Sequence, residues 1–268
     1  MTVKEADIAY ILAEEKKFLG TEIGNFFEEP ERQVAGYESI KVELTSPTGT
    51  EAYVDWVNSA FYNSLSTWDK SPEKFVSEMH ENYNIEQKEN LLFNIIKERP
   101  ISVALEGTTF CFKVTGIPRT QTHQIVRARQ AAFGQTSLRV ASCYSEPIRV
   151  PQSLLEKENN TELLDVFVKT VKMCRETYKR LIESGIPMEQ ARNIMPMGTC
   201  TNIGMCMNLR TLIDYVKGRT GDIAQDEHTY IVCLMMDELR KKQPKFFNVV
   251  KMFVPNVETT MEKYGVKS

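Results

Sequence analysis

The chain has 268 residues, of which 42% are hydrophobic and 26% charged, and its formal net charge is −3 at pH 7. Such a composition is ordinary for a globular protein with a substantial core. The charge balance excludes the overall basic surface of a nucleic-acid-binding protein, although a small anionic ligand needs only a local basic cluster. No apolar run approaches the length of a membrane span, and the first segment is charged throughout. We therefore predict a cytoplasmic protein that binds neither nucleic acid nor membrane.

The cysteines do not have the spacing of a metal site. The six of them stand at positions 111, 143, 174, 200, 206 and 233, with no Cys-x-x-Cys pair, and the chain has only three histidines. A zinc site needs tighter ligand spacing than this. We interpret the cysteines as reduced, mostly buried thiols and predict no metal site.

The first half of the chain alternates between helical and extended patterns. Apolar spacing predicts helices over residues 3–19, 51–66 and 86–97, and Ser71-Pro72-Glu73 has the composition of a further helix start. Residues 39–44 and 103–115 are rich in strand-forming side chains and predict two strands. Pro118 is expected to open a helix that carries Gln124 and runs up to Arg127.

The second half is mainly helical. Residues 135–142 alternate and predict a strand, in which Ser137 and Arg139 point to the same side. A long helix is expected over 161–183, ended by Gly185, and others over 188–194, 208–216 and 226–242. Gly218 is expected to end the third of these before Arg219. Segregated helices with a few strands predict an α+β fold.

Three arginines and a serine fall within thirteen residues, namely Arg127, Arg129, Ser137 and Arg139. Residues 130–136 carry no charge, so no acid close in sequence can pair with these arginines. Because guanidinium groups bind phosphate and carboxylate through two parallel hydrogen bonds, the cluster predicts a pocket for a nucleotide or a phosphorylated cofactor.

Several other polar residues also have ordinary structural explanations. Arg219 suits the end of a helix, where a cation is favoured by the helix dipole. Arg210 and Asp214 are four residues apart and could form a surface pair. No histidine stands beside Ser137 in sequence, which favours a binding role over a nucleophilic one. The methionines at 195, 197, 205 and 207 are interpreted as core residues.

Taken in order, these residues resemble the flavin-dependent thymidylate synthases, the ThyX family, whose signature is Arg-His-Arg, seven residues and Ser-x-Arg. Here Arg127-Ala128-Arg129 is followed by seven residues and then Ser137-Leu138-Arg139. The resemblance covers residues 40–250. It extends upstream to Glu106, Thr109-Phe110-x-Phe112 and Gln124, and downstream to residues 181–187, Ala191-Arg192, Pro196, Asn208-Leu209-Arg210-x-Leu212 and Arg219.

The resemblance implies a ThyX-like fold, with a small, mostly antiparallel sheet flanked by long helices. It implies one domain over residues 1–268, in which a helical extension (1–40) precedes a family-like core (40–250). It further implies a homotetramer whose active sites are shared between subunits. The implied reaction is reductive methylation of dUMP to dTMP, with FAD as cofactor, methylenetetrahydrofolate as one-carbon donor and NADPH as reductant.

The resemblance also implies roles for individual residues. The residues implied for FAD are Glu106, Arg127, Arg129, Asn208, Arg210 and Asp214. Those implied for dUMP are Gln124, Gln135, Ser137, Arg139, Arg192 and Arg219. Arg219 is in addition the implied catalytic residue, because it touches the base and helps to polarise it.

The chain departs from the family on the flavin and folate side. Ala128 replaces the motif histidine, Gln135 replaces a carboxylate, and Asp214 stands where the family commonly has Asn. Residues 99–107 lack the two histidines of the family's segment. Because an amide both donates and accepts hydrogen bonds, a pyrimidine nucleotide hydroxymethylase or a dCMP-modifying relative is an alternative. Loss of the histidines leaves a third hypothesis, a non-catalytic nucleotide-binding homologue.

Overall fold

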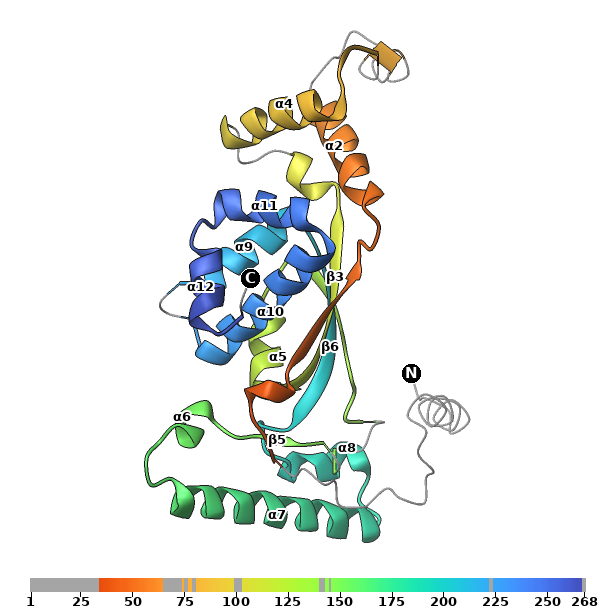
Figure 1. Ribbon diagram of the computed structural model, residues 1–268. Coiled ribbons are helices and arrows are strands. Elements are labelled where there is room, and N and C mark those ends of the chain that lie inside the picture. The colour runs from red at the N-terminus through yellow and green to blue at the C-terminus, as the bar shows by residue number, and fades with distance from the viewer. Residues whose placement is uncertain are drawn as a thin grey trace. The chain divides into compact units, whose positions relative to one another are not determined.

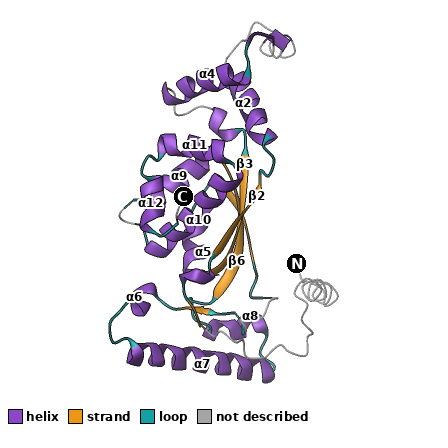
Figure 2. Cartoon of the chain, in the orientation of Figure 1, coloured by secondary structure: helices purple, strands orange, loops and turns teal. Residues whose placement is uncertain are grey.

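The computed structural model describes residues 34–64, 74, 77–78, 81–98, 103–139, 143–144, 146–221 and 224–266 (Figures 1 and 2). The helix expected over 3–19 and the helix start at 71–73 lie outside these residues. The chain divides into two compact units. The first takes its described residues from Met1–Lys41, Val114–Ile125 and Gly134–Ile203, and the second from Val42–Lys113, Val126–Phe133 and Gly204–Ser268.

A four-stranded antiparallel sheet has the strand order β2-β3-β6-β4. Its strands are β2 (Lys41–Ser46), β3 (Thr109–Pro118), β6 (Cys200–Asn208) and β4 (Ala131–Gln135). Burial alternates along the strands, as expected for a sheet with one face in the core. Phe110, Phe112 and Val114 are buried in β3, and Met205 and Met207 in β6. The sheet and the helices around it confirm the α+β prediction.

The core of the second unit is built around Phe246. Its ring centroid lies 5.0 Å from that of Phe110, 5.1 Å from Tyr53 and 5.3 Å from Trp56. Trp56 Nε1 donates to the carbonyl of Ala104 at 2.7 Å, so the polar edge of the indole is satisfied in the core. The helical segments of this unit are α2 (Glu51–Ser64), α4 (Ile85–Glu98), η3 (Val103–Glu106), α9 (Leu209–Arg219), α10 (Asp226–Lys242), α11 (Pro244–Phe253) and α12 (Val257–Lys263).

Two expectations for the second unit need correction. Residues 103–106 form η3, and the strand expected from 103 starts only at Thr109. Helix α9 continues through Gly218 to Arg219. Glycine within a helix costs about 1 kcal/mol relative to alanine. Buried Leu212, Ile213 and Val216 anchor this helix despite that cost.

The first unit is organised around α7 (Thr161–Glu183), which packs on residues of the segment that follows β4. Leu138, Cys143, Tyr144, Tyr178 and Ala191 form its buried cluster. Gly185 ends α7 in a left-handed conformation (φ 82°), and the amide of Ile186 donates to the carbonyl of Leu181 at 3.0 Å. The remaining elements are β1 (Val34–Ala35), η2 (Tyr37–Ser39), α5 (Arg119–Ile125), β5 (Ile148–Arg149), α6 (Gln152–Leu155), α8 (Met188–Ala191) and η4 (Arg192–Ile194).

The strand expected over 135–142 is wrong, since β4 ends at Gln135. The amide of Thr136 still donates to the carbonyl of Asn202 at 3.1 Å, and the chain then turns. The amide of Arg139 donates to Oγ of Ser137 at 3.2 Å, a short-range bond that serine offers in place of a ladder bond. Leu138 is buried, whereas Ser137 and Arg139 are both exposed.

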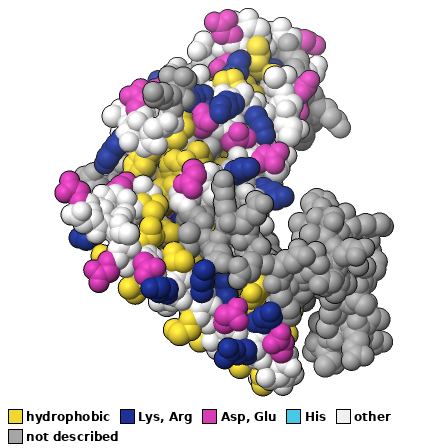
Figure 3. All heavy atoms as spheres, turned by 60° about the horizontal axis from the view of Figure 1, so that its bottom comes forward, with side chains coloured by type: hydrophobic (Ala, Val, Ile, Leu, Met, Phe, Trp, Pro, Cys, Tyr) yellow, Lys and Arg dark blue, Asp and Glu magenta, His cyan; other side chains and the backbone are white. Residues whose placement is uncertain are grey.

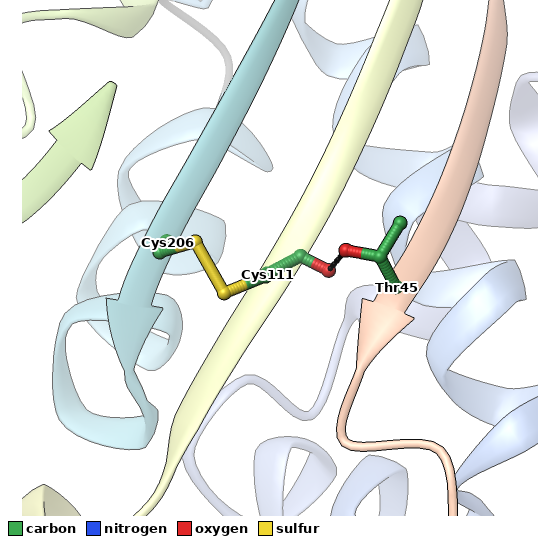
Figure 4. The surroundings of a disulfide bond; sticks show 3 residues. All are labelled: Thr45, Cys111 and Cys206. Carbon is green, nitrogen blue, oxygen red and sulfur yellow. Dashed lines mark hydrogen bonds between the residues drawn. A yellow bond between two sulfur atoms is a disulfide. The ribbon is translucent and has the colours of Figure 1, made fainter. Parts of the chain in front are cut away.

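A disulfide corrects the interpretation of the cysteines. Cys111 of β3 and Cys206 of β6 are bonded, next to the hydrogen bond from Thr45 Oγ1 to the carbonyl of Cys111 (Figure 4). The sheet order makes β3 and β6 neighbours, which brings together cysteines 95 residues apart in sequence. Cys143, Cys200 and Cys233 are buried, Cys174 is half-buried, and none of these four forms a disulfide.

Three further observations concern the described residues alone. Met197 is 51% exposed and is not a core residue, whereas Met205 and Met207 are. None of the described helices combines the length and apolar character that a membrane crossing needs. In the same residues, no group of three His, Cys, Asp or Glu side chains could hold a metal ion.

Candidate functional site

In the first unit, Glu189 brings together two of the arginines predicted for dUMP. Its Oε2 lies 3.1 Å from Nη2 of Arg139, and its carbonyl accepts a hydrogen bond from Nε of Arg192 at 3.1 Å. Ser137 belongs to the same turn as Arg139. The turn after β4 carries the hydroxyl and one guanidinium group, and η4, which follows α8, carries the other, so all three lie close to Glu189 in the chain or in space. Such groups suit an anionic ligand.

Arg119, which the sequence analysis did not single out, adds positive charge to this region. It begins α5, and its Nη2 donates to the carbonyl of Thr136 at 2.8 Å. Burial, and then the charge of Arg192, lower the pKa of Arg119, whereas Cys143 and Glu146 act in the opposite direction. Its buried Nε has no hydrogen-bond partner among the residues that the structure describes.

Glu146 is a carboxylic acid that lies near Arg119. Burial raises the pKa of its carboxyl, and the nearby guanidinium groups of Arg119 and Arg175 oppose the rise. Arg175 is buried and donates from Nη2 to the carbonyl of Glu146 at 2.7 Å. Among these described residues, the four guanidinium groups of Arg119, Arg139, Arg175 and Arg192 outnumber the carboxylates of Glu146 and Glu189. This excess favours an anionic ligand.

The two glutamines predicted for dUMP also belong to the first unit. Gln124 is half-buried on α5. Gln135 ends β4, and its Nε2 donates to Oγ1 of Thr122 at 3.1 Å, which ties its side chain to α5. Five of the six residues predicted for the nucleotide therefore lie in one unit, and Arg219 lies in the other.

In the second unit, residues predicted for FAD meet at the N-terminus of α9. Asn208 caps the helix, since its Oδ1 accepts from the amide of Thr211 at 2.9 Å. Nη1 of Arg210 lies 3.5 Å from Oε1 of Glu106. Thr211 Oγ1 donates to Oε1 of Gln130 at 3.5 Å, which brings the segment after Arg129 to the same helix end. A helix N-terminus beside an arginine suits the diphosphate of a dinucleotide.

The other residues predicted for FAD are Arg127, Arg129 and Asp214, whose side chains make no hydrogen bond or ion pair with Glu106, Asn208 or Arg210 in the described part of the chain. The side chains of Arg127 and Arg129 are exposed, and neither makes a hydrogen bond or ion pair within the described residues. Asp214 is exposed on α9, one turn beyond Arg210. The surface pair between Arg210 and Asp214 is absent from the described part of the chain, where Arg210 is directed to Glu106 instead.

Arg219 is half-buried in the last turn of α9. Its carbonyl accepts from Oγ1 of Thr229 at 2.9 Å, and over the described ranges its guanidinium makes no hydrogen bond or ion pair. One turn earlier, the hydroxyl of Tyr215 lies 2.7 Å from Nε2 of His228. Burial, and then the charge of Arg219, lower the pKa of His228 to about 4. Burial raises the pKa of Tyr215, and Arg219 opposes the rise.

The described residues contain no activated protein nucleophile at these positions. His123 is exposed on α5, His228 is bonded to Tyr215, and within the described residues neither is hydrogen-bonded to Ser137. Sequence reasoning missed Arg119, Glu146, Glu189, Tyr215 and His228, because each is defined by contacts with residues distant in sequence. The guanidinium groups of the first unit and the helix end of the second can both bind anions.

Comparison with known proteins shows the family to which the chain is related. Residues 45–245 match the family model described as thymidylate synthase complementing protein, Thy1. The flavin-dependent thymidylate synthase of Sulfurisphaera tokodaii is 34% identical over 149 residues, which cover 54% of this chain and 56% of that protein. The enzyme of the same name from Saccharolobus solfataricus is 36% identical over 146 residues, covering 53% of this chain and 54% of that protein. The chain thus spans little more than half the length of these relatives.

Solved structures show the same fold at low sequence identity. The UMP/dUMP methylase PolB from Streptomyces cacaoi, bound with 5-Br dUMP, superposes with a TM-score of 0.61 and 19% identity, covering 80% of this chain and 94% of that chain. Thymidylate synthase X from Helicobacter pylori, with FAD and dUMP, superposes with a TM-score of 0.55 and 18% identity. The match covers 79% of this chain and 98% of that chain. Both likenesses confirm the predicted ThyX-like fold.

Proposed function

The chain belongs to the Thy1 family, thymidylate synthase complementing protein, and from this premise we propose that it is a flavin-dependent thymidylate synthase acting on dUMP. The observation that carries the proposal is the gathering of Arg139 and Arg192 around Glu189, in a region with excess positive charge. A second gathering, of Glu106, Asn208 and Arg210 at one helix end, supports a dinucleotide cofactor.

In this proposal the nucleotide phosphate lies against Arg139, Arg192 and Ser137. The phosphate displaces the carboxylate of Glu189 from Arg139, because a dianion outcompetes a single exposed carboxylate for the same guanidinium. Gln124 and Gln135 bind the rest of the nucleotide through their amide groups, which donate and accept. The hydrogen bond from Gln135 to Thr122 keeps one of these amides close to α5.

FAD is proposed to lie against Asn208, Arg210, Arg127, Arg129, Glu106 and Asp214. When bound and reduced by NADPH, it supplies the reducing equivalents with which the carbon of methylenetetrahydrofolate becomes a methyl group on the pyrimidine. Arg219 is the proposed catalytic residue: its guanidinium, which makes no hydrogen bond or ion pair within the described residues, stabilises negative charge that develops on the base oxygen. Asn208 and Arg210 hold the cofactor in place, and the helix end adds its partial positive charge.

Two alternatives each rest on a specific substitution. Gln135 presents a neutral amide where the family has a carboxylate, which favours a changed pyrimidine such as dCMP, or a hydroxymethyl product. Ala128, in place of the motif histidine, favours a nucleotide-binding homologue without flavin. We retain both as outcomes of the test below.

A homotetramer is part of the proposal, as is a single core over residues 40–250 preceded by the extension 1–40. Helix α7 supports self-association, because Leu163, Val166 and Met173 are 50%, 56% and 64% exposed. Figure 3 turns the bottom of Figure 1 toward the viewer and shows apolar side chains between charged ones on that face. Sedimentation velocity tests the tetramer: Val166→Glu should shift the protein to smaller species, and a parent that sediments as a monomer would contradict it.

The test of the proposed function is an assay of product mass. The purified protein is reconstituted with FAD and incubated with dUMP or dCMP, methylenetetrahydrofolate and NADPH, and the nucleotide is weighed by mass spectrometry. The proposal predicts methylated dUMP, formed by the parent and not by Arg219→Ala. A hydroxymethyl product or a reaction with dCMP supports the first alternative. Protein that binds dUMP but never takes up flavin supports the second.

A further inference from the structure

A buried pair of polar side chains joins α9 to α10 beside Arg219. The hydroxyl of Tyr215 lies 2.7 Å from Nε2 of His228, Tyr215 is 7% exposed, and His228 is fully buried. Tyr215 precedes Arg219 by one helical turn, so both side chains project from the same side of α9. His228 directly precedes Thr229, whose hydroxyl donates a hydrogen bond to the carbonyl of Arg219 at 2.9 Å. The last turn of α9 is therefore tied to α10 at two neighbouring points.

Packing alone does not require this pair. A buried hydroxyl and a buried imidazole cost free energy unless they bond to each other, and two apolar side chains of similar shape are often neutral or stabilising by comparison. The interaction that the pair adds is directional, because a hydrogen bond fixes orientation as well as distance. The side chain that depends on this part of α9 is that of Arg219.

The pair also carries no charge next to Arg219. Both burial and the neighbouring guanidinium favour the neutral imidazole, and burial keeps the phenol protonated. A second cation at His228 would repel Arg219 and change where its guanidinium points. A neutral dipolar pair adds no competing charge beside the arginine.

We propose that Tyr215 and His228 are positioning residues that hold the guanidinium of Arg219 at the pyrimidine of the substrate. The inference rests on the proposed function, in which Arg219 stabilises charge that develops on the base. Donors serve this purpose only when they lie about 2.7–3.1 Å from the developing charge. A displacement of about 1 Å can lower the rate roughly a hundredfold.

The decisive variant replaces both partners by apolar residues, Tyr215→Phe with His228→Leu. It removes both members of the Tyr215–His228 hydrogen bond together, so neither of these two groups is left buried without the other. We expect kcat to fall at least tenfold, while the Kd for dUMP changes less, because most of the predicted nucleotide contacts lie in the first unit. Tyr53→Phe is the matched control, since it removes a tyrosine hydroxyl bonded to Glu89 at 2.8 Å between α2 and α4. It should leave kcat unchanged.

A double-mutant cycle separates positioning from a general structural effect. In an Arg219→Lys background, removing the Tyr215–His228 pair should cause little further loss of kcat, because the group that the pair positions is already changed. Full parental kcat in the double apolar variant would overturn the inference. The inference would also be overturned if removing the pair lowered kcat by the same factor in the Arg219→Lys background as in the parent.

A readout independent of turnover keeps the inference testable if the proposed function fails. In protein with labelled arginine, the Nε–H signal of Arg219 is identified by its loss in Arg219→Lys. We expect this signal to be narrow in the parent and broadened or shifted in the double apolar variant, with and without dUMP. An Arg219 signal that is the same in both proteins would refute positioning. A parent with the expected signal that never converts dUMP would refute only the proposed function.

Discussion

Glu189 and Arg139 stand 50 residues apart in sequence, yet their side chains meet at 3.1 Å. The pair joins α8 to the turn after β4, and the carbonyl of Glu189 also accepts from Arg192. One acidic residue thus gathers two arginines that the sequence analysis assigned to the nucleotide. Because the pair is exposed, it contributes up to about 1 kcal/mol and can open for a stronger anion.

Replacing Glu189 by Gln should strengthen dUMP binding. The carboxylate competes with the phosphate for Arg139, and its removal should raise affinity up to about fivefold, which corresponds to about 1 kcal/mol. Isothermal titration of parent and variant with dUMP measures the change. Glu183→Gln, an exposed acid at the end of α7, is the control and should bind as the parent does. Weaker binding by Glu189→Gln would show that the carboxylate orients Arg139 instead of competing for it.

Arg139→Ala and Arg192→Ala should each weaken binding of the nucleotide monophosphate by about 1.5–3 kcal/mol, since each removes a charge-assisted hydrogen bond. The same titration measures this loss, and deoxyuridine should bind parent and variants alike because it has no phosphate. Arg180→Ala, which removes an exposed arginine of α7, provides the control. If both variants bound dUMP as tightly as the parent, the phosphate site would lie elsewhere.

The buried His228 predicts a loss of stability in acid. Its pKa is about 4 in the folded chain against an ordinary value of 6.5, so the unfolded chain binds the proton first as the pH falls. The stabilisation is complete above pH 6.5 and is lost between pH 6.5 and about 4, with a slope of at most about 1.4 kcal/mol per pH unit. Urea unfolding at several pH values should show a shallower decline for Tyr215→Phe/His228→Leu than for the parent. Replacing the exposed His123 by Gln should leave the parental slope, and equal slopes in all three proteins would contradict the assignment.

The Cys111–Cys206 disulfide should stabilise the fold. A cross-link between residues 95 apart restricts the unfolded chain, and its loss typically costs about 2–4 kcal/mol. We expect Cys206→Ser, or the reduced parent, to unfold at lower denaturant concentration, whereas Cys174→Ser should behave as the parent does. Alkylation of the unreduced, unfolded protein followed by mass spectrometry should label four of the six cysteines. Labelling of all six would show that the two strands are not cross-linked.

Helices with strong local signals could be predicted from the sequence alone. The helix expected over 161–183 is found as α7, and the one over 226–242 as α10, because apolar spacing and end residues are local properties. Local patterns gave a wrong secondary structure where contacts with the rest of the fold decide the conformation. Alternation over 135–142 resembled a strand, but the bond between Arg139 and Ser137 closes a turn there.

The candidate site shows the same limit. The order and spacing of Arg127, Ser137, Arg192 and Arg219 indicated a nucleotide site although each residue alone was ambiguous. Glu189 and the Tyr215–His228 pair could not be found in this way, because their roles come from contacts across 50 and 13 residues of sequence. The disulfide likewise depends on strand order, which composition does not reveal.

Growth of a thymidine-requiring strain tests the central claim most directly. Expression of the parent chain should restore growth without thymidine, and expression of Arg219→Ala at the same level should not. Failure of folded, flavin-loaded parent protein to support growth would contradict a thymidylate synthase.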